Sequence, residues 1–289
     1  MYTDAALRDL EHRDPRVRAQ AADALGRVAD AEIPIALTAL VRAADDAHPS
    51  VRYAALLSLG ELGAAGGADA IIAHLGDDEP LCREASAIAL GQLGPGGGER
   101  AWSALASALS SPAPEVRFQA IASLAEIDAA RAAVVILPLA DDRDGKVRAQ
   151  VAAALGDSGD RVHGDRLARL LDDNDDVRHE ASLALARLGD RRGLPSLVRA
   201  LGDRNRALDA ATALAKLGIG GDAAATAALG HAVERWLGDP LVKVRAAEAL
   251  ARAGDDRGLV HLRRAARASR DDVRGLAQSV LSDLAHAAH

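Results

Sequence analysis

The sequence has few aromatic residues and one cysteine, and both shortages limit the fold. Only five of the 289 residues are aromatic, although 49% are apolar. The core must therefore be built mainly from Ala and Leu, which favours closely packed helices over sheets. Cys82 can form no internal disulfide, so a buried thiol is its simplest interpretation.

Targeting and membrane signals are also missing. The first residues contain no basic stretch followed by an apolar run, and nowhere do 18 apolar residues follow one another. We therefore expect a soluble cytoplasmic protein without a membrane partner. The formal net charge of -7 argues against nucleic acid as a partner.

The motifs of common catalytic sites are absent as well. The sequence has no Gly-x-Ser-x-Gly, no phosphate-binding loop and no dinucleotide fingerprint. We therefore predict no catalytic residues and no cofactor.

What the sequence does contain is a repeat. Val-Arg, two variable residues, Ala, two variable residues and Ala-Leu return nine times, with variations, at intervals of about 32 residues. The copies begin at Val17, Val51, Cys82, Val116, Val147, Val177, Arg206, Val242 and Val273. A unit of this length buries its apolar side only by stacking on its neighbours.

Each copy has the pattern of an amphipathic helix. In the first copy Val17, Ala21 and Leu25 fall on one side, and Asp14-Pro15 supplies an N-cap and a first-turn proline. A second apolar segment precedes each copy, and Pro34, Pro138 and Pro195 should mark helix starts or kinks there. We predict an all-α fold: a right-handed α-solenoid of about nine two-helix repeats, forming one domain over residues 1–289.

The repeated helix resembles the short HEAT-like repeats of phycobilisome lyases. The resemblance is carried by VRAQAADALG (17–26), CREASAIALG (82–91) and VRHEASLALA (177–186). It implies that the second helix of each repeat faces the concave side. It also implies that an aspartate six residues before the repeated arginine joins neighbouring repeats. The pairs with this spacing are Asp46 and Arg52, Asp77 and Arg83, Asp142 and Arg148, and Asp172 and Arg178.

If so, the second and sixth residues after each repeat start point into the concave face. Large apolar side chains at these positions cluster in the second to fourth repeats and would form a patch about 20 Å long. Such patches usually mark partner sites, unless tight curvature buries them between repeats. We therefore predict a non-enzymatic scaffold that binds a protein or peptide segment through Tyr53, Leu57, Ile88, Phe118, His179 and Leu183.

The alternative is an enzyme or enzyme subunit. His179-Glu180 resembles the metal-binding pair of deoxyhypusine hydroxylase, a di-iron enzyme on the same repeat, but that family needs several such pairs. No other copy of the repeat has His-Glu there, so we predict no metal site. A bilin lyase-like chromophore handler is the other candidate, since an apolar groove could hold a tetrapyrrole.

Two further features concern partners. Arg263, Arg267 and Arg270 have the spacing of a basic strip on one helix face, which could meet an acidic protein or phosphate. The terminal repeats also lack the polar outer face of a cap, which suggests self-association through the ends. The apolar residues at the ends are Ala5, Leu7, Leu10, Leu276, Val280, Leu281 and Leu284.

Overall fold

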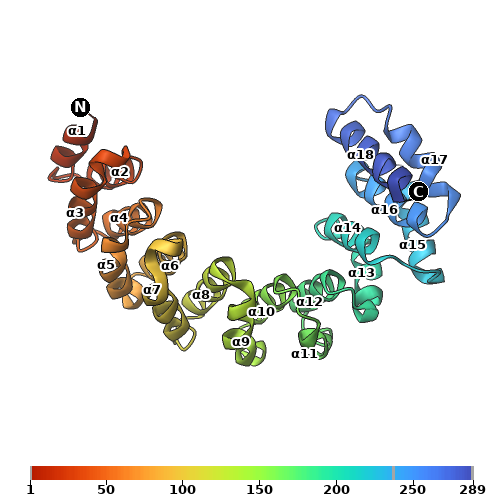
Figure 1. Ribbon diagram of the computed structural model, residues 1–289, viewed down its shortest axis with the longest axis horizontal. Helices are drawn as coiled ribbons and strands as arrows, with labels where there is room; N and C mark the ends of the chain where they lie inside the picture. Colours follow the sequence, from red (N-terminus) through yellow and green to blue (C-terminus); the bar gives the residue numbers. More distant parts are fainter. Residues whose placement is uncertain (1, 236–237, 288–289) are drawn as a thin grey trace. The chain divides into compact units, whose positions relative to one another are not determined.

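The computed structural model describes residues 2–235 and 238–287, and most of these residues are helical. Eighteen α-helices follow one another, with short 3₁₀ segments between several of them, and the described residues contain no β-strand. The chain divides into two compact units, Met1–Ala154 and Leu155–His289. Each is a stack of helical hairpins, which confirms the predicted all-α repeat architecture (Figure 1).

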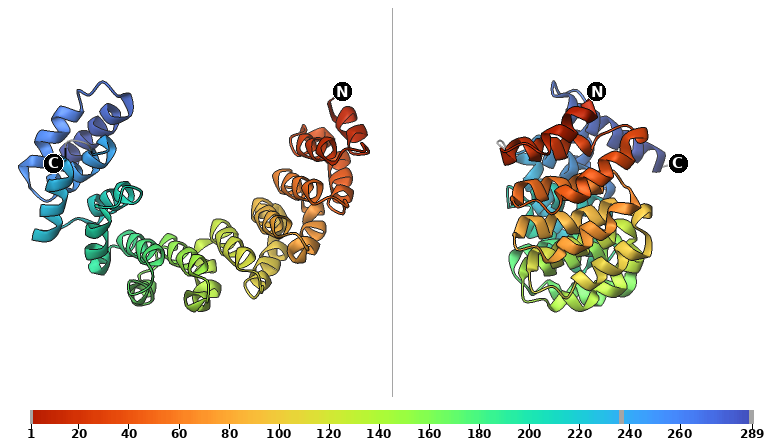
Figure 2. Two further views of the ribbon diagram at one scale, coloured as in Figure 1. Left: turned by 180° about the vertical axis from the view of Figure 1, so that it is seen from behind. Right: turned by 90° about the vertical axis from the view of Figure 1, so that its left-hand side faces the viewer.

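The first unit holds the N-terminal helices. Their bounds are α1 (Tyr2–Asp9), α2 (Pro15–Leu25), α3 (Ile33–Ala43), α4 (Pro49–Glu61), α5 (Ala68–Ala73), α6 (Pro80–Gln92), α7 (Gly94–Ala108), α8 (Pro114–Ile127), α9 (Ala129–Ile136) and α10 (Gly145–Asp157). Within this unit α2, α4, α6 and α8 follow its inner side, whereas α3, α5, α7 and α9 follow its outer side (Figures 1 and 2). The second helix of each repeat therefore faces inward in this unit.

The second unit begins in the last turn of α10. Its helices are α11 (Gly164–Leu170), α12 (Asp175–Arg187), α13 (Leu194–Ala200), α14 (Ala207–Leu217), α15 (Ala223–Glu234), α16 (Pro240–Arg252), α17 (Asp256–Ala265) and α18 (Asp271–Ala287). The apolar segment expected before the eighth copy of the repeat, residues 227–237, corresponds to α15, and its last two residues lie outside the described residues.

Local sequence signals determine where the helices begin. The side chain of Asp14 accepts a hydrogen bond from the backbone N–H of Arg16, and Pro15 opens α2. Pro34 and Pro195 are likewise the second residues of α3 and α13. Pro138 lies where α9 gives way to a 3₁₀ segment, Leu137–Asp141, because proline cannot continue the α-helical hydrogen bonds. The predicted starts and breaks at these prolines are therefore confirmed.

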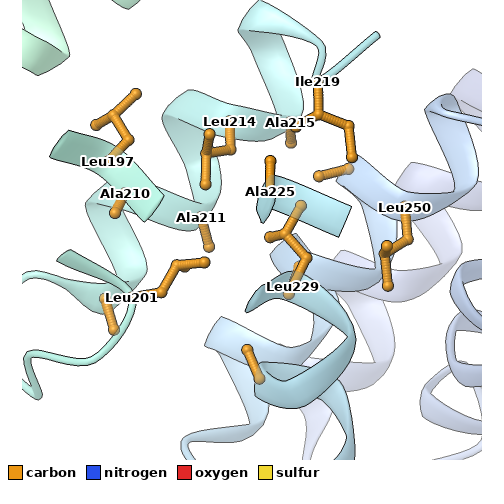
Figure 3. Close-up of a cluster of buried hydrophobic side chains, with 14 of the residues drawn as sticks. Leu197, Leu201, Ala210, Ala211, Leu214, Ala215, Ile219, Ala225, Leu229 and Leu250 are labelled. Carbon is orange, nitrogen blue, oxygen red and sulfur yellow. The ribbon is translucent and has the colours of Figure 1, made fainter. Parts of the chain in front are cut away.

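The core consists of small and branched aliphatic side chains. In the second unit Leu197, Leu214, Leu229 and Leu250 are fully buried together with Ala210 and other alanines (Figure 3). Such small residues let helices approach closely. In the first unit a Cβ at Gly91 would lie 2.7 Å from Oγ of Ser123, so glycine is needed where α6 meets α8.

An arginine of one repeat binds the aspartate of the next at three places in the first unit. Nε and Nη2 of Arg117 donate to the two carboxylate oxygens of Asp142 at 2.7 and 2.6 Å. The same bidentate geometry recurs in the pairs Arg18–Asp46 and Arg52–Asp77. The remaining nitrogen, Nη1, donates to the carbonyl oxygen six residues earlier, as Arg52 does to Asp46. We call this arrangement the Arg–Asp ladder.

The arginines hold the pKa of the ladder carboxylates below its usual range. For Asp46 the hydrogen bond from Arg18 lowers the pKa and outweighs partial burial. Burial raises the pKa of Asp77 and Asp142, but the hydrogen bonds that these carboxylates accept lower it by more. These aspartates are therefore charged structural links between repeats.

The repeat departs from this pattern at two places. Arg178 donates to the carbonyl of Leu171 and binds Asp175, while the side chain of Asp172 is exposed, so the fourth predicted pair has a different arrangement. In the seventh repeat α14 begins one residue after the repeat start, whereas the second helix of every other repeat begins two residues before it. The seventh copy, which has Arg206-Ala207 where most copies have Val-Arg, therefore lacks this first turn.

Candidate functional site

The apolar side chains predicted to bind a partner lie on three neighbouring helices of the first unit. Helix α6 packs against both α4 and α8. Tyr53 is 38% exposed, and the other three side chains are half-buried. The structure thus leaves part of each side chain uncovered within this unit. We call this set the apolar face: Tyr53 and Leu57 of α4, Ile88 of α6 and Phe118 of α8.

The helical period explains why these positions remain accessible. In α4 the buried residues Val51, Ala55 and Leu59 pack toward the core. Tyr53 and Leu57 lie between them in sequence and turn away from that side, because residues two apart are separated by about 200° around a helix. By the same period Ile88 lies at the edge of the buried side of α6, so it is only half-buried. The apolar face is therefore carried by well-packed helices and not by loops.

Carboxylates interrupt and border the apolar face. Glu84 occupies on α6 the repeat position that Tyr53 and Phe118 occupy on α4 and α8. Glu61 and Glu126 are exposed at a common repeat position, ten residues after the repeat start. Within the described part of the chain neither Glu84 nor Glu126 has a hydrogen-bond or ion-pair partner, whereas Glu61 lies 3.8 Å from Nε of Arg27. The border is therefore negatively charged.

The charge of the whole first unit has the same sign. Residues 1–154 contain 22 acidic and 14 basic side chains, a formal net charge of -8. Residues 155–289 contain 20 acidic and 21 basic side chains, a net charge of +1. The negative charge of the protein is therefore concentrated in the unit that carries the apolar face.

His179 and Leu183 lie on α12, in the second unit. His179 is half-buried, and its Nδ1 has no hydrogen-bond partner among the described residues. Burial lowers the pKa of this imidazole and raises the pKa of the neighbouring Glu180 carboxyl. Leu183 packs against the buried cluster of the second unit. These two residues therefore belong to the second unit and are not part of the apolar face.

The surroundings of His179-Glu180 offer few ligands for a metal. Over residues 2–235 and 238–287 no group of three or more His, Cys, Asp or Glu side chains is arranged to hold a metal ion. A di-iron centre takes several His and carboxylate ligands from facing helices. The donor set of a di-iron centre is therefore not found in the described residues.

The basic strip is shorter than the sequence suggested. Helix α17 ends at Ala265, so Arg263 lies in its last turn while Arg267 and Arg270 come after it. A helical spacing therefore cannot align the three side chains. Arg270 also binds Asp272 at 2.6 Å, which offsets its charge. Arg263 and Arg267 remain exposed.

None of the described helices is long and apolar enough to span a membrane.

Comparison with known proteins finds similarity at the level of the repeat. The family model described as HEAT repeats matches residues 3–91, 38–125 and 102–179. The model of the PBS lyase HEAT-like repeat matches residues 177–203. A search of curated proteins finds no match.

Several solved structures have a similar fold. The Escherichia coli protein YibA is 21% identical, with 95% of this chain and 98% of that one covered and a TM-score of 0.61. An engineered protein is 21% identical over 98% of this chain and 88% of its own, with a TM-score of 0.53. The complex of CpcE and CpcF of phycocyanin lyase from Nostoc gives 20% identity, 98% and 94% coverage and a TM-score of 0.48. At such identities the first two likenesses show the fold alone.

Proposed function

Because the chain belongs to the HEAT-repeat proteins, whose family model covers more than half of it, we propose that it is a non-enzymatic scaffold that binds a segment of a partner protein on the apolar face. The observation that carries this proposal is the partial exposure of Tyr53 beside three half-buried apolar side chains. Aromatic anchors of this kind commonly dominate binding energy at protein interfaces. Because they stand on packed helices, little ordering of the receptor would oppose binding.

The charges around the apolar face favour a partner segment with basic residues. Glu84 and Glu126 have no ion-pair partner in the described structure, and the unit as a whole carries a net charge of -8. Complementary charge at an interface speeds association and selects among partners. We therefore expect a segment with two or three apolar anchors and adjacent Lys or Arg. A helix of about 13 residues would span about 20 Å, the expected length of the apolar face.

A displayed library of random 15-residue peptides tests this proposal. We expect selected peptides to combine apolar anchors with basic residues. Tyr53→Ala should weaken their binding at least tenfold, because truncation of a central aromatic anchor costs about 2 kcal/mol or more. Fluorescence anisotropy with labelled peptides measures the affinity, and circular dichroism confirms that the variant remains folded.

Val134→Ala is the matched control. Val134 is an apolar residue on the outer helix α9, 73% exposed, and its truncation should leave peptide affinity unchanged. A library without enriched sequences, or peptides that bind Tyr53→Ala as tightly as the original protein, would contradict the proposal.

The match of residues 177–203 to the PBS lyase HEAT-like repeat motivates a second candidate, a bilin lyase-like chromophore handler. An apolar groove would then hold a tetrapyrrole instead of a peptide. Titration with biliverdin, followed by visible absorption, tests this candidate directly. A shifted bilin band that is lost in Tyr53→Ala would favour it over peptide binding. No observation favours the hydroxylase alternative, because the described residues lack its set of ligands.

A further inference from the structure

A cavity with mixed lining lies between α12 and α14 in the second unit. Its volume is about 650 Å³, within the range of small-molecule sites. Leu183, Ala213 and Leu217 supply apolar walls, whereas Arg161, Arg187 and Lys216 supply positive charge. We call it the α12–α14 cavity. Its lining residues belong to the second unit, whereas the residues of the apolar face belong to the first.

Basic side chains outnumber acidic ones around this cavity. Asp209 contributes one negative charge against three positive ones. Arg187 is ion-paired with Asp157, at 3.2 Å, but both side chains are substantially exposed. In the described structure the side chains of Arg161 and Lys216 have neither a hydrogen-bond nor an ion-pair partner. Two cations are therefore available to a ligand.

The helix termini explain part of this charge but not all of it. Arg187 and Lys216 lie in the last turns of α12 and α14, where cations interact favourably with the helix dipole. Arg161 lies in a 3₁₀ segment before α11, so the dipoles of α12 and α14 do not require it. The positive charge that Arg161 adds to the cavity is therefore independent of those two dipoles.

Arg161 lacks a contact that its counterpart in the next repeat makes. Arg191 stands at the same place one repeat later, and its Nη2 donates to the carbonyl oxygen of Ile219 at 2.6 Å. The guanidinium of Arg161 approaches Gly189, with Nη2 3.2 Å from the position a Cβ would take, but it makes no such hydrogen bond. Arg161 therefore keeps its five N–H donors for another acceptor.

We propose that the α12–α14 cavity binds a small carboxylic acid with an apolar body. The carboxylate would accept hydrogen bonds from the guanidinium of Arg161 and the ammonium of Lys216, which are charge-assisted and stronger than neutral ones. The apolar body would cover Leu183, Ala213 and Leu217. Arg161 and Lys216 lie exposed at the rim of the cavity, whereas Leu183, Ala213 and Leu217 form its apolar wall, so an amphipathic anion matches both parts of the lining.

Isothermal titration with decanoate, at a concentration below its micelle-forming range, tests the proposal. We expect saturable binding to the full-length protein. Decanol, which has the same chain without the charge, should bind at least tenfold more weakly. Equal binding of the two would overturn the proposal, as would the absence of decanoate binding up to 1 mM.

Charge variants then locate the site. Arg161→Gln and Lys216→Gln should each weaken decanoate binding at least fivefold, because each removes a cation from the carboxylate site. Asp209→Asn should strengthen binding at least twofold, because it removes a repelling charge. Arg169→Gln removes an exposed cation of α11 that does not line the cavity, and it should leave the affinity unchanged.

Comparison of the cavity variants with Arg169→Gln tests whether the decanoate binds in the α12–α14 cavity. Loss of affinity in Arg169→Gln equal to that in Lys216→Gln would show a non-specific effect of net charge and overturn the proposal. Unchanged affinity in both cavity variants would place the decanoate elsewhere and also overturn it. Thermal melting confirms that each variant is folded, and because Arg161 and Lys216 are independent positions, either variant alone keeps the test valid.

Discussion

The arginines of the ladder each make two kinds of contact. One edge of the guanidinium binds the carboxylate of the next repeat, and the other binds a backbone carbonyl of its own loop, as in Arg117 with Asp142 and Ser111. In this pair the side chains are only 6% and 9% exposed. Removal of one partner would leave the other buried and uncompensated, which is the costly case for an ion pair.

Asp142→Asn should lower the free energy of unfolding by about 3 kcal/mol, because Arg117 would keep its buried charge without a carboxylate. Urea denaturation measures this change. Asp23→Asn is the control, because Asp23 pairs with Arg27 where the side chains are 53% and 65% exposed; its cost should stay below about 1 kcal/mol. Similar losses in the two variants would show that burial does not determine the contribution.

The sequence predicted part of this ladder. The spacing of Asp46 to Arg52 marked both residues as structural, and the structure shows that both are. The spacing could not show which arginine binds the carboxylate, because Arg18 and Arg52 occupy the same position in two successive repeats. The carboxylate of Asp46 binds Arg18, while Arg52 binds its carbonyl.

At the scale of helices, the stacking depends on places without a side chain. A Cβ at Gly258 of α17 would lie 2.4 Å from both the carbonyl oxygen of Ala247 and the amide nitrogen of Ala251 in α16. These are backbone atoms, so no rotamer change can relieve the overlap. Gly275, within α18, has no atom within 4 Å of its Cβ position. Replacing the two glycines with alanine should therefore change stability in opposite directions.

Gly258→Ala should destabilise the protein by about 1–3 kcal/mol, because α17 would have to move away from α16. Gly275→Ala should stabilise it by about 0.5–1 kcal/mol, because alanine favours a helix interior more than glycine does. Thermal and urea denaturation of both variants provide the measurement. A stabilising Gly258→Ala would contradict this prediction, because it would mean that α17 can move away from α16 without a cost in free energy.

The helices themselves could be predicted from the repeat, but the contacts between side chains of different helices could not. Pro34 and Asp14 are local signals, and both act where expected. The α12–α14 cavity was not predicted, because Arg161 and Lys216 are 55 positions apart and only the backbone brings them to one cavity. A sequence signal does exist: Arg187 and Lys216 share one repeat position, where earlier repeats have Glu61 and Glu126.

At the scale of the whole molecule, the two units differ in charge and the repeat runs through both. The boundary at residues 154 and 155 falls inside α10, and we maintain the proposal of one HEAT-repeat domain over residues 1–289. The apolar face could be predicted because its residues break a regular pattern. How far curvature would cover Tyr53 could not, since that depends on the spacing of whole repeats.

Acid should unfold the protein through the ladder carboxylates. The pKa values of Asp46, Asp77 and Asp142 are lower in the folded state than the value near 4 of an unfolded aspartate. Their contribution to stability is therefore complete above about pH 4 and is lost as the pH falls through the folded-state values. In a series of melting curves from pH 7 to pH 3, the melting temperature should decrease once the pH is below about 4. The decrease should be less steep for Asp142→Asn.

The ladder also gives the first unit a direction. In every link the arginine belongs to the repeat nearer the N-terminus and the aspartate to the repeat nearer the C-terminus. The two ends of a shortened stack are therefore not equivalent. A fragment that stops before Asp142 ends on a half-covered cation at Arg117, whereas a fragment that starts after Arg18 begins with a half-covered anion at Asp46. Fragments cut just after an aspartate loop keep every Arg–Asp ion pair intact, and those are the natural points at which this stack divides.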